Sequence, residues 1–247
     1  MISQMLFGEL CVMITKKHND WCRVTLEWDG YEGWVDRKQL RLVSKSEYLK
    51  LMKNRAYTLD LCAPIYGDHK SIPVLLGSSL PNFDGISLKM GKQRLRYSGQ
   101  TISPEKTVLK AELLRKIAFK YLSAPYLWGG RSPFGLDCSG YVQNVFKLFG
   151  IRMPRDAYQQ ATIGDPVDFI QQSKLGDLAF FSNEEGKIIH VGIILEDGLI
   201  IHASGEVRVD RLDHFGIYNA HKKRYSHFLR VIKRVVVFGE EGGQITL

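Results

Sequence analysis

Short runs of alternating apolar and polar residues dominate the first hundred positions. They are separated by glycine, asparagine and aspartate residues, which favour tight turns. We therefore predict an all-β unit over residues 1–45 and further short strands from Leu61 to Ile102. Between them, residues 46–58 carry apolar positions at helical spacing, and Ser44 and Glu47 are placed to form a capping box at the helix start.

The pattern changes after Thr107. Apolar residues then recur with the helical period and predict an amphipathic helix of about four to five turns, which Pro125 ends. A second helix is predicted from Cys138 to Phe149, with Gly150 as its C-terminal stop. Strand-like apolar runs follow at 177–182, 188–195, 198–204 and 227–238. Helices followed by consecutive strands indicate an α+β domain with an antiparallel sheet.

These patterns divide the chain into four parts. The first β unit occupies 1–45, and a helical linker with a second small β unit occupies 46–105. The α+β domain occupies 106–237, and a C-terminal tail occupies 238–247.

Composition narrows the classes of protein. Among 247 residues, 45% are hydrophobic and 24% are charged, which is ordinary for a globular protein and argues against disorder. The net charge of +8 would suit an anionic partner, but the basic residues are spread along the chain without a nucleic-acid-binding signature. We therefore expect a basic globular surface, no nucleic-acid partner and no membrane span. The oligomeric state is left open.

The four cysteines contain no C-x-x-C pair, and no histidine follows them at zinc-finger spacing, so no structural metal site is predicted. The N-terminal residues lack the basic start, apolar core and cleavage site of a signal peptide. A cytoplasmic protein with free thiols is the expectation. The alternative is an exported protein whose signal peptide has been removed.

Cys138 is the candidate nucleophile. It lies between a loop rich in glycine and the start of a predicted helix. A helix N-terminus carries partial positive charge, which lowers a thiol pKa, and its free N–H groups can hold an oxyanion. The alternative is a buried structural cysteine on a core helix. The polar neighbours Asp137 and Ser139 argue against that alternative.

A nucleophilic cysteine needs a base. Two of the seven histidines, His190 and His202, lie inside apolar strand-like runs, whereas most of the others lie in polar segments. An imidazole buried in a strand needs a polar partner. These two histidines therefore predict a mutual contact, with two independently satisfied core histidines as the alternative.

The loop length of the hairpin between these two strands determines whether the two histidines can contact each other. If the loop has three residues and ends at a left-handed Gly198, Leu195 pairs with Leu199. His202 then lies opposite Gly192, and the other histidine lies two residues along on the same face. A two-residue loop would place the histidines on opposite faces. The sequence favours the first register, in which His190 takes the thiol proton and His202 orients its ring.

These residues resemble the NlpC-type family of bacterial cell-wall cysteine peptidases, which have a papain-like core. The matching pieces, in chain order, are Tyr126 with Trp128-Gly129-Gly130, Asp137-Cys138-Ser139-Gly140, Pro154-Arg155-Asp156, Gly176-Asp177-Leu178, His190-Val191-Gly192 and Ile201-His202-Ala203-Ser204. The resemblance implies that Tyr126 helps to stabilise the oxyanion, with a packed aromatic as the alternative. The cysteine chemistry that this resemblance implies requires no metal or organic cofactor.

The N-terminal β units resemble bacterial SH3-like barrels, most specifically in the run from Asp29 to Leu40. The chain is therefore expected to be an α+β papain-like domain preceded by one or two small all-β SH3-like barrels. This combination resembles enzymes that cut γ-D-glutamyl bonds to diaminopimelate or lysine in murein peptides. In those enzymes the first barrel closes one end of the cleft, so that only peptides with a free N-terminal L-Ala fit.

A substrate ammonium requires a buried carboxylate, for which Asp137 and Glu9 are the candidates. Tyr31 is expected to close the site from the barrel side, and Ser139 to bond the peptide. Each residue also has a structural alternative. Asp137 could be a helix cap and Ser139 a residue of the first helical turn. Glu9 could be a charge on a strand face and Tyr31 part of the barrel core.

Arg155 is expected either to meet a substrate carboxylate or to pair with Asp156. After these two residues the relatives often carry serine, but this chain has Ala157, which puts strict specificity in doubt.

The leading prediction is thus a cysteine endopeptidase or dipeptidyl-peptidase acting on murein peptides. The alternatives are an amidase or acyltransferase with the same core, and a non-catalytic protein that binds peptidoglycan.

Overall fold

The computed structural model describes residues 1–16, 20–53, 55–91, 93–239 and 242–246. The chain forms two compact units, Ile2–Thr107 and Val108–Leu247, the second of which includes Met1. Each unit has its own elements and its own hydrophobic core, and the two are described one after the other.

The N-terminal unit begins with a three-stranded antiparallel sheet. Its strands, in the order β1-β2-β3, are β1 (Cys11–Lys16), β2 (Trp21–Leu26) and β3 (Glu32–Asp36), followed by the short 3₁₀ helix η1 (Arg37–Gln39). Alternate residues of β2, Cys22, Val24 and Leu26, are buried. This alternation confirms the all-β character predicted for the first residues.

Helix α1 (Lys45–Leu51) begins as predicted, because the Ser44 hydroxyl accepts a hydrogen bond of 3.1 Å from the amide of Glu47. The prediction that the helix continues to residue 58 is wrong. Residues Arg55–Thr58 form strand β4, which pairs with two other strands and buries its last three side chains. Burial and strand pairing outweigh the helical spacing of the apolar residues there.

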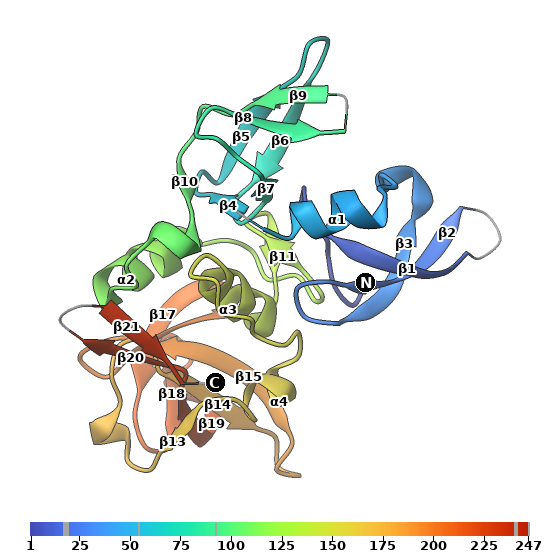
Figure 1. Ribbon diagram of the computed structural model, residues 1–247. Helices are drawn as coiled ribbons and strands as arrows, with labels where there is room; N and C mark the ends of the chain where they lie inside the picture. Colours follow the sequence, from blue (N-terminus) through green and yellow to red (C-terminus); the bar gives the residue numbers. More distant parts are fainter. Residues whose placement is uncertain (17–19, 54, 92, 240–241, 247) are drawn as a thin grey trace. The chain divides into compact units, whose positions relative to one another are not determined.

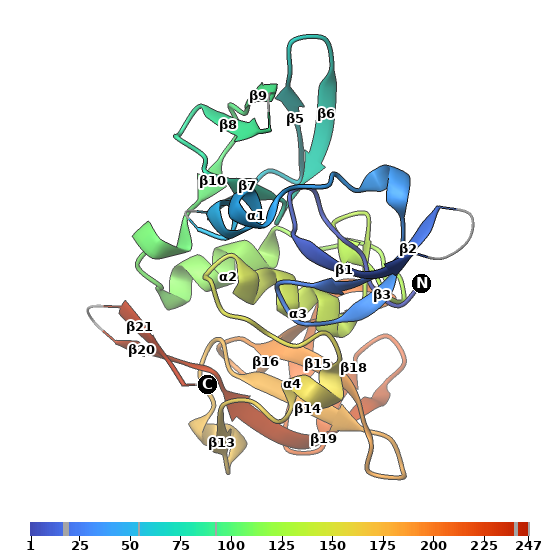
Figure 2. The ribbon, with the colours of Figure 1, turned by 45° about the vertical axis from the view of Figure 1, so that its right-hand side comes forward.

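The remaining strands of this unit form two small sheets (Figures 1 and 2). One has the order β10-β4-β7 and the other β6-β5-β9-β8. Their bounds are β5 (Cys62–Tyr66), β6 (Ser71–Leu75), β7 (Ser79–Pro81), β8 (Ser87–Met90), β9 (Gln93–Arg96) and β10 (Thr101–Ile102), followed by η2 (Pro104–Lys106). Their buried apolar residues make one core cluster that includes Ile65, Val74 and Leu88.

The C-terminal unit starts with helix α2 (Ala111–Phe119), which is shorter than predicted at both ends. Before it, the carbonyl of Leu109 accepts a hydrogen bond from Gly243 in the C-terminal hairpin. After it, Ser123 takes a positive φ of 64° and its amide donates to the carbonyl of Val207. The chain leaves the helix because both flanks pair with strands that are distant in sequence.

Helix α3 (Cys138–Lys147) has all ten residues buried, as expected of a helix in the middle of a domain. It packs on α2 and on strands β15 and β16 of the sheet described next. Gly150 ends it as predicted: its φ is +78°, and the amide of Ile151 donates to the carbonyl of Phe146.

Six strands of this unit close into a barrel, because β18 pairs with both β17 and β19. They are β14 (Leu178–Ser182), β15 (Ile188–Ile194), β16 (Leu199–Ser204), β17 (Glu206–Leu212), β18 (Gly216–Asn219) and β19 (Arg224–Arg234). The four predicted strands are confirmed, although the last one ends at residue 234. Strands β17 and β18 were not predicted, and they close an antiparallel sheet that otherwise would have two edges.

Smaller elements complete the unit: β11 (Arg131–Ser132), β12 (Gly135–Leu136), α4 (Ala157–Gln160), η3 (Ile170–Gln172) and β13 (Asp165–Val167), which extends the sheet beside β19. The segment expected as a C-terminal tail belongs instead to a hairpin of β20 (Val236–Gly239) and β21 (Gly242–Ile245). Residues 240, 241 and 247 of that tail lie outside the described residues. No helix in the described parts of the chain has the length and apolar character to cross a membrane.

Candidate active site

The predicted nucleophile, Cys138, is the first residue of helix α3. The carboxylate of Asp137 caps the helix by accepting a hydrogen bond of 2.7 Å from the amide of Gly140. The Cys138 thiol receives backbone hydrogen bonds from Val191 and Ser139. Because Val191 directly follows His190 in strand β15, the thiol lies against the part of the sheet that carries the predicted base.

The protonation state of Cys138 differs from the sequence expectation. Burial raises the pKa of its thiol to about 12, and the negative charge of Asp137 raises it further. The backbone hydrogen bonds and the positive charge of Arg155 act in the opposite direction but do not outweigh burial. The expected lowering of the thiol pKa by the helix N-terminus is therefore wrong for this structure, in which Cys138 is a neutral thiol.

The hairpin between β15 and β16 has the predicted register. The amide of Leu195 donates to the carbonyl of Leu199, Gly198 has a φ of +67°, and His202 pairs with Gly192. A Cβ added to Gly192 would lie 2.8 Å from the Cβ of His202, so only glycine leaves the required room. Both histidines consequently lie on one face of the sheet, as predicted.

Three polar side chains form a diagonal line across strands β15, β16 and β17. The Nε2 atom of His190 lies 2.8 Å from Nδ1 of His202, and Nε2 of His202 lies 3.1 Å from Oδ2 of Asp210. Arg208 completes the line, with Nη2 donating to Oδ1 of Asp210 at 2.9 Å and Nε 2.7 Å from Oδ2. The steps from His190 to His202 and from His202 to Asp210 each join adjacent strands two positions out of register, whereas Arg208 and Asp210 both lie on β17.

This line determines the tautomers of both histidines. Burial favours a protonated Asp210, but hydrogen bonds from His202 and Arg208 outweigh it and lower the pKa of the carboxyl. An ionised carboxylate only accepts hydrogen bonds, so His202 must donate from Nε2 and its Nδ1 is an acceptor. His190 must then donate from Nε2, which leaves its Nδ1 with a free lone pair. A nitrogen in that state can accept a thiol proton.

His227 on strand β19 stacks on His190, with ring centroids 4.1 Å apart and planes at 24°. Burial, followed by the neighbouring His202 and His227, lowers the pKa of His190 well below its ordinary value. Burial and His202 lower the pKa of His227 to about 4. Both rings are therefore neutral near pH 7.

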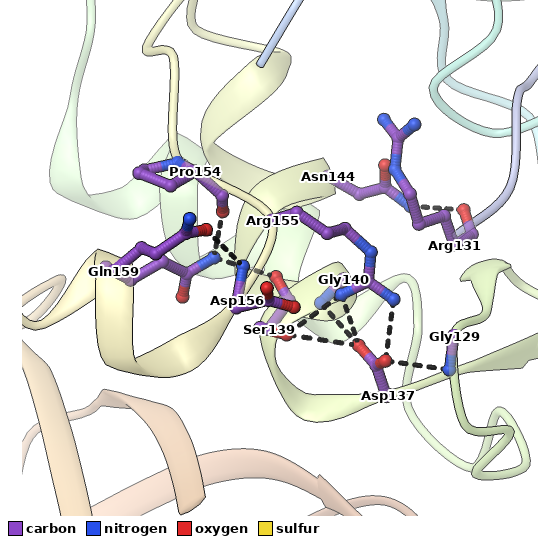
Figure 3. A network of polar contacts seen from close by, with 11 residues as sticks. Gly129, Arg131, Asp137, Ser139, Gly140, Asn144, Pro154, Arg155, Asp156 and Gln159 are labelled. Atoms are coloured by element: carbon purple, nitrogen blue, oxygen red, sulfur yellow. Dashed lines mark hydrogen bonds and ion pairs between the residues drawn. The ribbon is translucent and has the colours of Figure 1, made fainter. Parts of the chain in front are cut away.

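On the helix side of Cys138, the carboxylate of Asp137 is the centre of a buried network (Figure 3). It accepts hydrogen bonds from the amides of Gly129 and Gly140 and from the Ser139 hydroxyl. Arg155 binds it through both terminal nitrogens, at 3.0 and 2.6 Å, and also donates to the Ser139 hydroxyl. Arg155 thus pairs with Asp137, a partner that the sequence did not indicate.

The loops around the helix start are tied to α3 by side-chain amides (Figure 3). Gln160 donates to the carbonyls of Ser139 and Pro154, and Asn144 donates to the carbonyl of Arg131. These bonds hold the loops on both sides of Cys138 in place, so the nucleophile sits in a rigid frame. Ala157, at the start of α4, is buried beside this frame.

Tyr126 lies close to the thiol. Burial raises the pKa of its hydroxyl to about 12, and the neighbouring Cys138 and Asp137 raise it further. The hydroxyl therefore keeps its proton and can donate a hydrogen bond. Its backbone amide donates to the carbonyl of Gly205 at the turn between β16 and β17.

The other two predicted site residues lie in the N-terminal unit. A carboxylate oxygen of Glu9 accepts a hydrogen bond from the amide of Leu6, and the amide of Tyr31 donates to Asp29. Among the described residues, no group of three or more His, Cys, Asp and Glu side chains is arranged to hold a metal ion.

Sequence reasoning missed Asp210 and His227. Asp210 had a usable signal: Ser204-Gly205-Glu206 forms the tight turn between β16 and β17, and that turn sets Asp210 diagonal to His202. His227 had no such signal, because β19 comes near β15 only through the long-range pairing of β14 with both strands.

Comparisons with known proteins agree with this geometry. The sequence profile of the NlpC/P60 family matches residues 123–229, which contain Cys138, His190, His202 and Asp210. The profile of the bacterial dipeptidyl-peptidase SH3 domain matches residues 1–40.

Two relatives carry the name gamma-D-glutamyl-L-lysine dipeptidyl-peptidase. The protein from Bacillus subtilis (strain 168) is 31% identical over 219 residues, which are 81% of this chain and 71% of that protein. The Bacillus cereus protein is 30% identical over 224 residues, covering 81% of this chain and 66% of that protein.

A crystal structure of an NlpC/P60 family protein from Bacillus cereus ATCC 10987 superposes with a TM-score of 0.78 at 26% identity, covering 94% of this chain and 81% of that one. The chain is therefore a peptidase of the NlpC/P60 family, with an N-terminal SH3 domain of the bacterial dipeptidyl-peptidase type.

Proposed function

We propose that this chain is a cysteine peptidase that hydrolyses the bond between γ-D-glutamate and the following diamino acid in murein peptides. The relatives named for this activity support the substrate class. The observation that carries the chemistry is the thiol of Cys138 held by the amide of Val191, beside a His190 whose Nδ1 is left as a proton acceptor. A cysteine at the start of a helix faces histidines on an antiparallel sheet, and we propose on this basis that the domain has a papain-like core.

In the proposed reaction, Cys138 Sγ attacks the γ-carbonyl carbon of the D-glutamyl residue while Nδ1 of His190 takes the thiol proton. The oxyanion is stabilised by the Tyr126 hydroxyl and by the positive end of the α3 dipole. His190 returns the proton to the leaving amine, the C–N bond breaks, and a thioester forms. Water, deprotonated by His190, then hydrolyses the thioester and restores the thiol.

His202 and Asp210 act as positioning residues in this scheme. They keep the Nε2 proton of His190 in place and so aim the lone pair of Nδ1 away from the sheet. When His190 becomes an imidazolium, the charge of Asp210 stabilises it through His202.

A free N-terminal L-Ala is part of the proposal. Asp137 is buried next to the nucleophile and is the proposed partner of the substrate ammonium, with Ser139 bonding the peptide. Because Arg155 already pairs with Asp137, the ammonium would join an existing ion pair. Glu9 and Tyr31 are proposed to close this end of the site from the SH3 domain. Residues 46–105 are proposed to form a second SH3-like barrel.

We also propose a cytoplasmic site of action on recycled peptides. All four cysteines, including the exposed Cys62, are free thiols in the structure, as is usual in a reducing compartment.

The test is cleavage of L-Ala-γ-D-Glu-diaminopimelate and its lysine counterpart, followed by chromatography of the products. Cys138→Ala should abolish cleavage with little change in thermal stability, and Cys62→Ala, which removes an exposed thiol, is the matched control. Acetylating the L-Ala amine should greatly slow cleavage. Retained binding of peptidoglycan without cleavage of either peptide would contradict the peptidase assignment, and activity only toward other amides or acyl acceptors would favour an amidase or acyltransferase.

A further inference from the structure

A basic pocket of about 640 Å³ lies in the C-terminal unit, beside the histidines of the site. It lies between the turn that joins β16 to β17 and the turn that joins β18 to β19. Its lining residues are Ser204, Gly205, Arg208, Asn219, Lys222, Arg224, Tyr225, Ser226 and His227.

This pocket adjoins the proposed site through His227. His227 lines the pocket and stacks on His190. Ser204 lies two residues after His202 on β16, and Arg208 holds the carboxylate of Asp210. A molecule in the pocket is therefore separated from the proposed base by a single imidazole ring.

The charge of the pocket is positive. Three cationic side chains line it, and none of the described residues that line it is acidic. Two carboxylates bonded to lining residues are already engaged, because Asp210 binds Arg208 and Asp213 accepts a hydrogen bond of 2.6 Å from the Tyr225 hydroxyl. Within the described residues, the side chains of Lys222 and Arg224 form no ion pair, so their charges are available to an anion.

The proposed reaction determines which part of the substrate lies next to this pocket. His190 must protonate the leaving nitrogen, so the residue that follows the scissile bond lies beside this histidine. The acyl part extends in the other direction, toward Asp137 and Ser139 on the helix side of the thiol. The pocket next to His227 is therefore placed to receive the side chain of the leaving diamino acid.

We propose that this pocket binds the side-chain carboxylate of diaminopimelate, and that the enzyme prefers diaminopimelate to lysine after the scissile bond. This inference rests on the proposed function. A diaminopimelate side chain ends in a carboxylate and an ammonium, whereas a lysine side chain ends in an ammonium alone. Lys222 and Arg224 attract the carboxylate and repel the bare lysine ammonium.

The test compares three tripeptides that differ only in this side chain: diaminopimelate, its side-chain carboxamide, and lysine. We expect kcat/KM to fall about tenfold from the acid to the amide, the size of one charge-assisted hydrogen bond, and at least as far for lysine. The double variant Lys222→Gln with Arg224→Gln should cleave the acid more slowly and lose most of the difference between acid and amide. The control, Arg115→Gln with Lys116→Gln on α2, makes the same change in net charge on exposed side chains outside the pocket.

Binding of the same peptides to Cys138→Ala, measured by calorimetry, separates the two proposals. Preferential binding of the acid without any cleavage by the wild type would support the pocket and contradict the peptidase chemistry. Equal cleavage and equal binding of acid and amide would overturn the pocket and leave the peptidase intact. Discrimination that survives in the Lys222 and Arg224 double variant would also overturn it.

Discussion

Asp210→Asn tests whether the tautomer of His190 is set from a distance. The substitution keeps the shape of the side chain but removes its charge and replaces one oxygen with an NH₂ group. Oδ2 of Asp210 now accepts from His202 Nε2, at 3.1 Å. If the NH₂ group takes that place, it donates to Nε2 and reverses the tautomer of His202. His190 must then carry its proton on Nδ1, where it cannot take a proton from Cys138.

The size of the effect follows from the place of Asp210 in the line. Partners one step beyond a functional group typically contribute about 10- to 100-fold, and Asp210 acts through one further ring. Its hydrogen bond and ion pair with Arg208 and the burial of His202 favour the upper part of that range. We therefore expect kcat/KM to fall by about 100-fold, or about 2.7 kcal/mol in the transition state, with KM nearly unchanged.

The assay is steady-state cleavage of L-Ala-γ-D-Glu-diaminopimelate across pH, with thermal unfolding measured in parallel. Asp165→Asn, which neutralises an exposed carboxylate on β13, is the matched control. A structural role alone would lower the stability and leave kcat of the folded fraction unchanged. An Asp210→Asn enzyme with wild-type kcat and an unchanged pH profile would refute the role assigned to this carboxylate.

Two further predictions concern stability. Arg155→Met should lower the free energy of unfolding by about 3–5 kcal/mol, because it leaves the buried Asp137 carboxylate without its cation. Unfolding in urea measures this loss. A loss below about 1 kcal/mol would show that the ion pair is not structurally important. Burial lowers the pKa of His227 to about 4, so between pH 6.5 and 4 only the unfolded chain protonates this ring, and the free energy of unfolding should decrease as the pH falls. His227→Phe should make that decrease shallower by at most about 1.4 kcal/mol per pH unit, and identical slopes in the two proteins would contradict the assignment.

Features that depend on neighbouring residues were predictable from the sequence. The hydroxyl of Ser44 caps α1, and Gly150 ends α3 in a left-handed conformation. The loop ending at Gly198 sets the register that brings His190 and His202 onto one face. In each case the interaction joins residues close in sequence, so turn and cap chemistry alone determines it.

Features that depend on distant segments were decided by the tertiary structure. Helix α2 is short because both of its flanks pair with remote strands, and the barrel closes only because β19 returns to pair with β14. The pairing of Asp137 with Arg155 and the stacking of His227 on His190 likewise join separate elements.

The charge state of Cys138 is the clearest case. Its position at a helix start predicted a lowered thiol pKa, and burial raises it to about 12 instead. The field of a helix end is a property of local sequence, whereas desolvation depends on everything that packs around the thiol. The sequence by itself therefore determined the proposed reacting groups and their order along the chain, and only the packed structure determined their protonation states, because burial is a property of the whole domain.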